Sequence, residues 1–463
     1  MANNVYIVDQ LATGTETITV NDDGSGIDWI VIQGVYSLAT DIRLGHGYPP
    51  SSTSGSGFYY NPGNWGHRLI VVGLIENARG SNGTDYIQGN ELGNLLYGDA
   101  SNAGPGGADT IDAADGNDTV FGGAGNDTIN AADGNDLLFG DAGNDTLSGN
   151  YGADTLVGGA GADSMSGGSD GTDWVFYTTS SAAVDVRLIA GDTSTSYGGD
   201  AQGDRIHGVN HVRGSAFNDR ITDQPESNFY NTNRFDGMDG HDHLKMGGGN
   251  DTAYGGNGND TIEGATGNDR LYGEAGGDRI YAGAGNDTVF GGDGYNLLDG
   301  GAENDRVVGG ALRETLYGGT GEDTLLGNGG NDLFFGGTGR DRLLGGAGND
   351  TLIGGGGKDR LIGGAGADHF KFIARSESGP GATTRDVIED FRRLQGDKIN
   401  FDQLIATGDF IGRAAFGHHA GEVRFITTTT GSRALFDMDG DGRADMSVDV
   451  LGVSTLRASD FIL

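Results

Sequence analysis

The sequence predicts an all-β fold in which short strands stack in parallel into two solenoids, with irregular β-rich caps around them. The first observation is a nine-residue phrase, G-G-x-G-x-D-x-U-x with U a large apolar residue, which repeats without a break over residues 237–371. The second is a shorter run of the same phrase over residues 104–166, preceded by looser copies at 80–97. A fixed period of this kind indicates a solenoid, because each repeat must bury its apolar face against its neighbours.

Each phrase is expected to end in a three-residue strand centred on U. In residues 255–263, the strand Thr261-Ile262-Glu263 points Ile262 to one side and its two neighbours to the other. Stacked phrases then align their U residues into a narrow core, with about 4.8 Å between adjacent strands.

Aspartate occupies the sixth position of nearly every phrase. The shorter array has Asp109, Asp118, Asp127, Asp136, Asp145, Asp154 and Asp163 there. The longer array has Asp242, Asp251, Asp260, Asp269, Asp278, Asp287, Asp305, Asp323, Asp332, Asp341, Asp350, Asp359 and Asp368. Near the middle of the longer array Asn296 and Glu314 take the sixth position and Glu303 replaces a glycine, so a weaker site is expected there.

This pattern of glycine and aspartate predicts calcium sites. Glycine reaches positive φ without steric cost, so a glycine-rich run can turn several backbone carbonyls toward one point. A hard cation such as Ca²⁺ takes six to eight oxygen ligands, and the recurring aspartates supply the negative charge. No cysteine is present to offer a soft ligand. Asp and Asn also suit tight turns, but turn chemistry alone does not require Asp at one position through two arrays.

The phrase is identified as the calcium-binding repeat of RTX proteins. The resemblance implies a β-roll in which two phrases form one 18-residue turn and several Ca²⁺ ions lie between successive turns at each edge. Of the 463 residues, 92 are glycine and 6 are proline, and because the glycines are periodic the arrays are not a disordered linker.

The charge limits the partners and the compartment. A net charge of −38 argues against nucleic acid and against adsorption to anionic membranes. Rows of carboxylates should prevent folding until calcium binds, so binding and folding are expected to be one event. Extracellular calcium modules need about 10⁻⁴–10⁻³ M ion, which predicts a secreted or cell-surface protein.

The two ends of the sequence suggest how the chain is exported. The start, MANNVY, has no basic and apolar signal peptide, and the longest strongly apolar run, residues 69–75, is too short to span a bilayer. The last six residues, ASDFIL, resemble the tail of type I secretion substrates. This resemblance implies that the type I export machinery is a partner of the chain. Residues 367–372, 385–391 and 396–401 resemble the serralysin-type C-terminal domain.

That C-terminal region contains a further candidate metal loop. Asp437, Asp439 and Asp441 match the start of an EF-hand loop, D-x-D-x-D-G, but Val448 stands at position twelve, where a glutamate is needed. A partial cation site and a solvated acidic turn are both compatible with this sequence.

We divide the chain into five segments. These are an N-terminal β cap (1–79), the first β-roll (80–172), a second cap-like β segment (173–236), the second β-roll (237–371) and a C-terminal cap with the secretion signal (372–463). The two caps echo each other, DWIV at 28–31 with DWVF at 173–176 and DIRL at 41–44 with DVRL at 185–188. A Pro-, Ser-, Gly- and Tyr-rich insertion, residues 45–66, is present only in the first copy and is either a contact loop or decoration.

No catalytic constellation is recognised. The H-E-x-x-H zinc helix of serralysins is absent, and the nearest approach, His207 to His211, lacks the glutamate. Residues 167–171 fit G-x-S-x-G only by coincidence in so glycine-rich a chain.

We therefore expect a structural surface-layer, matrix or adhesive component, with self-assembly or a cell-surface glycan as partner. The alternatives are a secreted polysaccharide-modifying or hydrolytic enzyme with its site in the caps, and a non-catalytic accessory module.

With an 18-residue turn, the positions after U form two outward columns in the longer array. One column is entirely apolar: Tyr254, Tyr272, Phe290, Val308, Leu326, Leu344 and Ile362. The opposite column is mixed: Glu263, Tyr281, Asp299, Tyr317, Phe335, Ile353 and Lys371. The apolar column indicates either a packing face or a tolerated exposed β-face. Arg270, Arg306, Arg342 and Arg360 flank it and are interpreted as a solvated row of charges.

Overall fold

The computed structural model describes residues 5–9, 17–20, 29–33, 41–44, 68–70, 77–80, 82–99, 106–168, 170–188, 195–223, 232–404 and 408–463, with side chains from residue 78 onward. The insertion 45–66 lies outside these residues. The chain forms two compact units, Met1–Ser227 and Asn228–Leu463, which are taken separately below.

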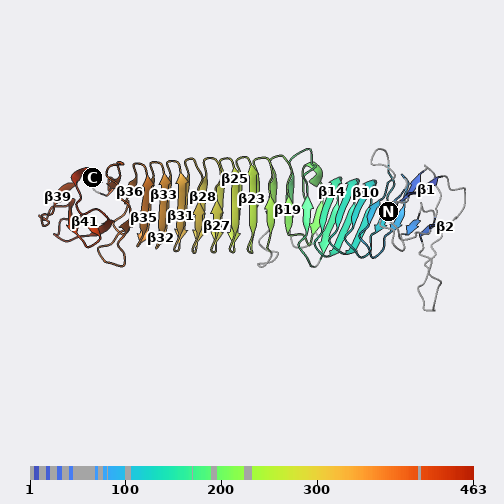
Figure 1. Cartoon of the computed structure of the whole chain (residues 1–463), viewed down its shortest axis with the longest axis horizontal. Coiled ribbons are helices and arrows are strands. Elements are labelled where there is room, and N and C mark those ends of the chain that lie inside the picture. Colours follow the sequence, from blue (N-terminus) through green and yellow to red (C-terminus); the bar gives the residue numbers. More distant parts are fainter. Residues whose placement is uncertain are drawn as a thin grey trace. The chain divides into compact units, whose positions relative to one another are not determined.

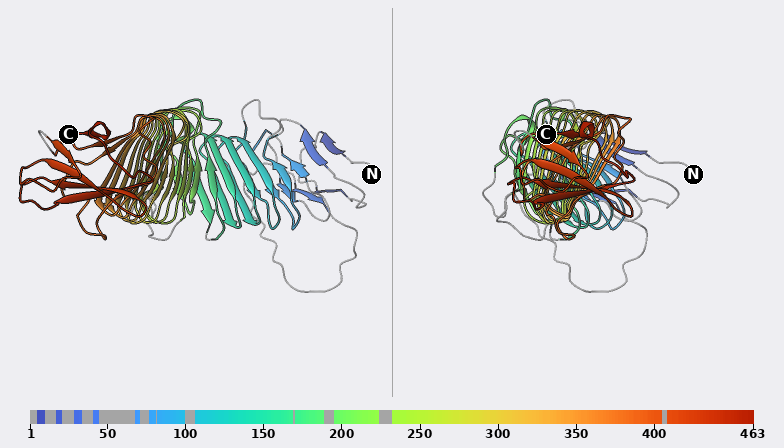
Figure 2. Two further views of the ribbon diagram at one scale, coloured as in Figure 1. Left: turned by 60° about the vertical axis from the view of Figure 1, so that its left-hand side comes forward. Right: turned by 90° about the vertical axis from the view of Figure 1, so that its left-hand side faces the viewer.

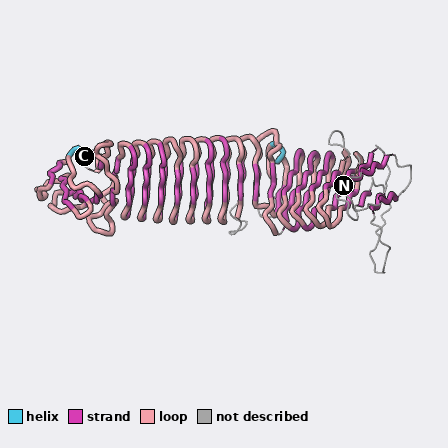
Figure 3. Tube along the Cα trace, in the orientation of Figure 1, coloured by secondary structure: helices cyan, strands magenta, loops and turns pink. Residues whose placement is uncertain are grey.

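The predicted all-β parallel solenoid is confirmed. Figures 1 and 3 show the successive strands of each unit lying side by side. Within the described residues there is no α-helix, only the single-turn 3₁₀ helices η1 (Gly199–Ala201) and η2 (Ala458–Asp460).

In the first unit two parallel sheets, here called 1a and 1b, alternate along the chain. Sheet 1a contains, in pairing order, β1 (Val5–Asp9), β3 (Trp29–Gln33), β6 (Asn77–Arg79), β8 (Leu95–Tyr97), β10 (Thr119–Ala124), β12 (Leu137–Ala142), β14 (Thr155–Ala160), β16 (Trp174–Phe176) and β19 (His211–Arg213). Sheet 1b contains β2 (Thr17–Val20), β4 (Asp41–Leu44), β5 (Arg68–Ile70), β7 (Tyr86–Gln88), β9 (Thr110–Asp112), β11 (Thr128–Asp133), β13 (Thr146–Tyr151), β15 (Ser164–Gly168) and β18 (Arg205–His207). Strand β17 (Asp185–Leu188) pairs in parallel with β20 (Arg220–Asp223).

The second unit has the same design in sheets 2a and 2b. Sheet 2a contains β21 (Arg234–Asp236), β23 (Thr252–Asn257), β25 (Arg270–Ala275), β27 (Thr288–Phe290), β29 (Arg306–Val308), β31 (Thr324–Gly329), β33 (Arg342–Ala347), β35 (Arg360–Ala365) and β37 (Val387–Ile388). Sheet 2b contains β22 (His243–Lys245), β24 (Thr261–Thr266), β26 (Arg279–Ala284), β28 (Leu297–Ala302), β30 (Thr315–Thr320), β32 (Leu333–Gly339), β34 (Thr351–Gly357), β36 (His369–Lys371), β38 (Lys398–Asn400) and β43 (Phe461–Ile462).

The register confirms the 18-residue turn, because Ile262 pairs with Ile280 and Ile280 with Leu298. These U residues are fully buried and form the core between the two sheets of the roll. Most array strands are six residues long, twice the expected length. Pairing continues past U into the next phrase, where Ala265 meets Gly283.

Several strands outside the arrays continue the same ladders. In the second cap-like segment, β16 and β19 extend sheet 1a and β18 extends sheet 1b, so this segment adds turns with longer loops. The five-segment division itself stays a prediction.

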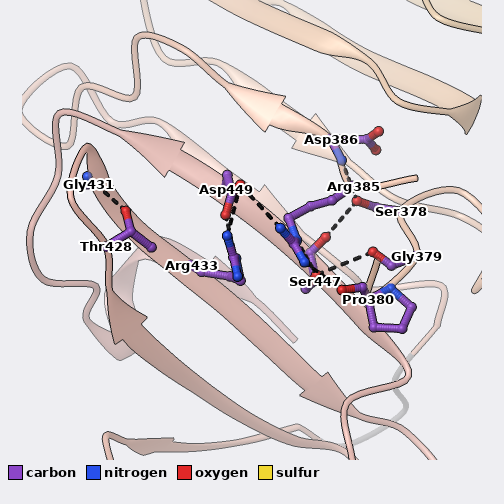
Figure 4. Close-up of polar contacts among 10 residues, drawn as sticks. All are labelled: Ser378, Gly379, Pro380, Arg385, Asp386, Thr428, Gly431, Arg433, Ser447 and Asp449. Carbon is purple, nitrogen blue, oxygen red and sulfur yellow. Dashed lines mark hydrogen bonds and ion pairs between the residues drawn. The ribbon is translucent and has the colours of Figure 1, made fainter. Parts of the chain in front are cut away.

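The C-terminal segment closes the second roll with a small mixed sheet, in which the first pair of strands is parallel and the next two pairs are antiparallel. Its strands are β39 (Asp409–Gly412), β40 (Glu422–Thr427), β41 (Gly431–Asp437) and β42 (Met446–Leu451), and β42 pairs in parallel with β37 at the end of sheet 2a. Figure 2 shows them fanning out in red. Arg385 ties the loop before β37 to this sheet, because its Nε donates to Ser447 Oγ at 2.7 Å and its guanidinium lies 3.6 Å from Asp449, which also pairs with Arg433 (Figure 4).

Candidate calcium sites

The sixth-position aspartates line up along the edges of the rolls. They form four rows, two in each unit, and none of these aspartates is more than 3% exposed. In each row, the Oδ1 atom of one aspartate accepts the backbone N–H of the residue one turn earlier. Asp332 N–H donates to Asp350 Oδ1 at 2.9 Å, for example, and Asp350 N–H donates to Asp368 Oδ1 at 3.0 Å. The structure thus gathers the predicted aspartates into continuous rows.

The second carboxylate oxygen of these aspartates is different. It is buried, and within the described residues it has no hydrogen-bond partner. This holds for Oδ2 of Asp109, Asp118, Asp127, Asp136, Asp145, Asp154, Asp163, Asp260, Asp269, Asp278, Asp287, Asp305, Asp323, Asp332, Asp341, Asp350, Asp359 and Asp368. A buried carboxylate oxygen without a donor is costly. Regular rows of such oxygens therefore indicate sites suited to a cation.

The first glycine of each phrase makes room at this oxygen. A Cβ on Gly345 would lie 2.3 Å from Asp350 Oδ2 and 2.4 Å from the carbonyl oxygen of Gly363 in the next turn. The absence of a side chain therefore leaves a space bordered by a carboxylate oxygen and a carbonyl oxygen from successive turns. These are the ligand types that calcium prefers.

Two aspartates that lie in the same rows but outside the regular repeats can be compared with the aspartates of the repeats. Asp204 Oδ2 accepts the Tyr177 hydroxyl at 2.9 Å, and Asp397 Oδ2 accepts the Arg392 N–H at 2.6 Å. At these two positions the protein supplies a donor to Oδ2, whereas in the regular repeats Oδ2 has no donor. Asp386 is the exception, because its Oδ2 is also bare at the end of the row that contains Asp359.

Burial and like charge change the acidity of these carboxyl groups. Burial, with a smaller contribution from neighbouring carboxylates, raises the pKa of Asp109 to about 9 and that of Asp305 to about 8. Burial raises the pKa of Asp136 and Asp323 to about 6. Without a cation these side chains therefore favour the protonated form, and a divalent ion would supply the positive charge that keeps them ionised.

The family description "RTX calcium-binding nonapeptide repeat (4 copies)" matches residues 104–138, 139–174, 230–262, 254–289, 281–312, 308–343 and 335–370. The chain carries RTX calcium-binding repeats. No curated protein matches the chain. Among solved structures, the solution structure of the AlgE6R3 subunit of the Azotobacter vinelandii mannuronan C5-epimerase is 28% identical, with a TM-score of 0.23, over 35% of this chain and 78% of that one.

The RTX array of the second unit has one interrupted row. Asn296 and Glu314 stand one turn apart in the same row, so the other row keeps its aspartates from Asp251 to Asp359. The Asn296 Oδ1 still accepts the Asp278 N–H at 2.8 Å, but an amide nitrogen takes the place of the bare oxygen. The Glu314 Oε2 accepts the N–H of Gly310 in its own phrase at 3.1 Å. Their weaker calcium affinity stays a prediction.

Restoring this row tests that expectation. The double variant Asn296→Asp/Glu314→Asp should raise the thermal midpoint in saturating calcium, because two carboxylates again face the space beside their glycines, and should lower the calcium concentration needed for folding. In chelator the same variant should gain nothing, since added buried charge is unfavourable without a cation. An equal gain with and without calcium, in calorimetry of both states, would contradict a metal role for this row.

The EF-hand-like loop forms a separate acidic cluster. Of the residues that the structure describes, only Asp437, Asp439 and Asp441 form a group of three metal-type ligands, with one atom of each within 4.8 Å of the others. Asp437 is buried, and its two oxygens accept the N–H groups of Gly440 and Gly442 at 2.7 and 2.8 Å. The backbone thus already satisfies part of this carboxylate, and cation binding here stays a prediction.

The sequence analysis missed the aspartates that continue the rows beyond the arrays. Asp173, Asp204, Asp386 and Asp397 each accept an N–H from the last aspartate of an array, at 2.8 to 3.2 Å. They share a shorter signal, D-x-U, as in Asp173-Trp174-Val175, but not the regular spacing of the nine-residue phrase. A search for D-x-U alone would have found them.

His207 and His211, the nearest approach to a zinc motif in the sequence, lie on different sheets. His207 lies on β18 of sheet 1b and His211 on β19 of sheet 1a. His243 pairs with Glu263 at 3.1 Å, and His419 lies 3.4 Å from Glu422. The described part of the chain also contains no helix long and apolar enough to cross a membrane.

Proposed function

We propose that this protein is secreted, takes up several calcium ions between successive turns along both edges of each roll, and folds as it does so. The observation that carries the proposal is the contrast between bare Oδ2 atoms beside glycine and the donor-satisfied Oδ2 atoms of Asp204 and Asp397. Extracellular calcium is sufficient for such modules, whereas cytosolic calcium is not. A chain that stays unfolded inside the cell suits export by a type I machinery.

We further propose that the folded protein is a structural component of a surface layer, matrix or adhesive coat. Long regular β-faces support this role, since sheet 2a presents an outward column of apolar side chains that pair strand by strand from Tyr254 to Ile362. The resemblance of the last hundred residues to the serralysin C-terminal domain, and the secretion signal within it, are parts of the same proposal.

The test is analytical ultracentrifugation of the purified chain at rising calcium. The proposal predicts two stages, first compaction of the monomer and then growth into large assemblies. A compact monomer that never associates, at the highest protein and calcium concentrations, would overturn the structural role while leaving calcium-dependent folding intact.

A further inference from the structure

The outer face of sheet 2a carries a row of regularly spaced arginines. The first residues of its strands pair in the order Thr252, Arg270, Thr288, Arg306, Thr324, Arg342 and Arg360. From Arg270 to Arg342, arginine and threonine alternate on successive strands. With about 4.8 Å between strands, the guanidinium groups recur about every 10 Å along the roll.

Three of these arginines have no partner in the described part of the chain. Arg270, Arg306 and Arg342 are exposed, and none of them forms an ion pair or a side-chain hydrogen bond there, whereas Arg360 pairs with Glu389 at 2.6 Å. The chain has 66 acidic and 28 basic residues, so carboxylates to pair with them are abundant. Unpaired cations in so acidic a protein are available for an external anion.

The row is not a requirement of the repeat. In sheet 2b the equivalent residues from Thr261 to Thr351 include one arginine, Arg279. In sheet 1a they are Thr119, Leu137 and Thr155. The repeat therefore accepts threonine at this position and does not itself require arginine.

Beside the row runs the apolar column. Tyr254, Tyr272 and Phe290 stack with ring centroids 4.8 and 5.1 Å apart and nearly parallel planes, and aliphatic residues continue the column. Rings stacked in this way cover one another's faces, so they offer a continuous apolar ridge. A ligand on this face would meet cations, hydroxyls and an apolar ridge in parallel lines.

We propose that this face binds a linear acidic polysaccharide that lies along the roll, across the strands. The carboxylates of every second sugar pair with Arg270, Arg306 and Arg342, because a guanidinium holds a carboxylate with two parallel hydrogen bonds. Thr288 and Thr324 contact the sugar hydroxyls between them, and the apolar ridge packs against the C–H faces of the rings. Duplex nucleic acid is a poorer fit, since its charge is denser than that of a polyuronate and the net charge of −38 therefore repels it more strongly.

The test measures how the full-length, calcium-loaded chain binds a fluorescent oligogalacturonate, by anisotropy at one fixed calcium concentration. The variant Arg270→Thr/Arg306→Thr/Arg342→Thr should bind about tenfold more weakly, from the loss of three exposed ion pairs. Its matched control is Arg205→Thr/Arg220→Thr/Arg279→Thr, which makes the same charge change at exposed strand-initial positions of other sheets. The control should bind within about twofold of the unmodified chain.

Several outcomes would overturn the proposal. Equal loss in both variants would mean that net charge or calcium bridging, not this face, governs binding. Undiminished binding by the first variant, or equal binding of a neutral galactan, would also overturn it. If single-stranded DNA bound more tightly than the uronate through the same arginines, the partner class would be wrong. Because these assays need only the folded monomer, they fail or succeed independently of assembly.

Discussion

In chelator, the chain is expected to be unfolded at about pH 8 and to become compact as the pH falls toward about 5. Burial raises the pKa of many of the row aspartates above the ordinary 3.8, to about 6 for Asp136 and to about 9 for Asp109. The metal-free folded state therefore binds more protons than the unfolded state. The contribution of these carboxyl groups to the stability of the metal-free fold is fully present below pH 3.8 and is lost as the pH rises through about 6 to 9.

Calcium should reverse this dependence. The ion competes with protons for the same oxygens, so calcium affinity should fall as the pH is lowered through the same range, with protons released on binding. Circular dichroism across this pH range measures the pH dependence of folding twice, once in chelator and once in calcium. A metal-free chain that is folded at pH 8 and unfolds on acidification would contradict the assignment of buried, proton-seeking carboxylates to the rows.

The second large effect is expected from one added methyl group. In Gly345→Ala, the new Cβ would lie 2.3 Å from Asp350 Oδ2 and 2.4 Å from the Gly363 carbonyl oxygen, inside the proposed ion space. Such overlap should cost roughly 1–3 kcal/mol in calcium. It should also raise the calcium concentration at the folding midpoint several-fold, because the two oxygens can no longer approach a common ion.

The matched control is Gly356→Ala, eleven residues further along the same array. A Cβ there meets nothing within 4 Å, and this glycine has no positive φ. The control should leave the calcium midpoint unchanged and should change stability only slightly. Calcium titrations followed by calorimetry compare the two variants. Equal losses would indicate that alanine harms the array through the backbone in general and not through a metal site.

The repeat made most of the fold predictable. The position of U and the nine-residue period determined which side chains are buried, and Ile262, Ile280 and Leu298 lie in the core as expected. The 18-residue turn followed from the RTX resemblance. Strand length was wrong, because the pairing of Ala265 with Gly283 depends on a neighbouring turn that local periodicity does not describe.

The candidate sites were predictable in residue type and spacing but not in detail. The sequence analysis identified Asp350 as a ligand, yet only the structure separates its Oδ1, which accepts a backbone N–H, from its bare Oδ2. The placement of Asn296 and Glu314 in one row follows from the turn length, but the diversion of Glu314 toward Gly310 does not. Tyr177 and Asp204 lie 27 residues apart with no repeat linking them, so their contact required the folded loops.

The most direct test of calcium-coupled folding is small-angle scattering of the full chain at neutral pH, starting in chelator and adding calcium. The unfolded chain should have a radius of gyration on the order of 80 Å. We predict a sharp, cooperative fall in that radius as calcium approaches about 10⁻⁴–10⁻³ M, with magnesium at the same concentration having no such effect. A chain that is already compact in chelator at neutral pH, or that stays expanded in saturating calcium, would contradict the account.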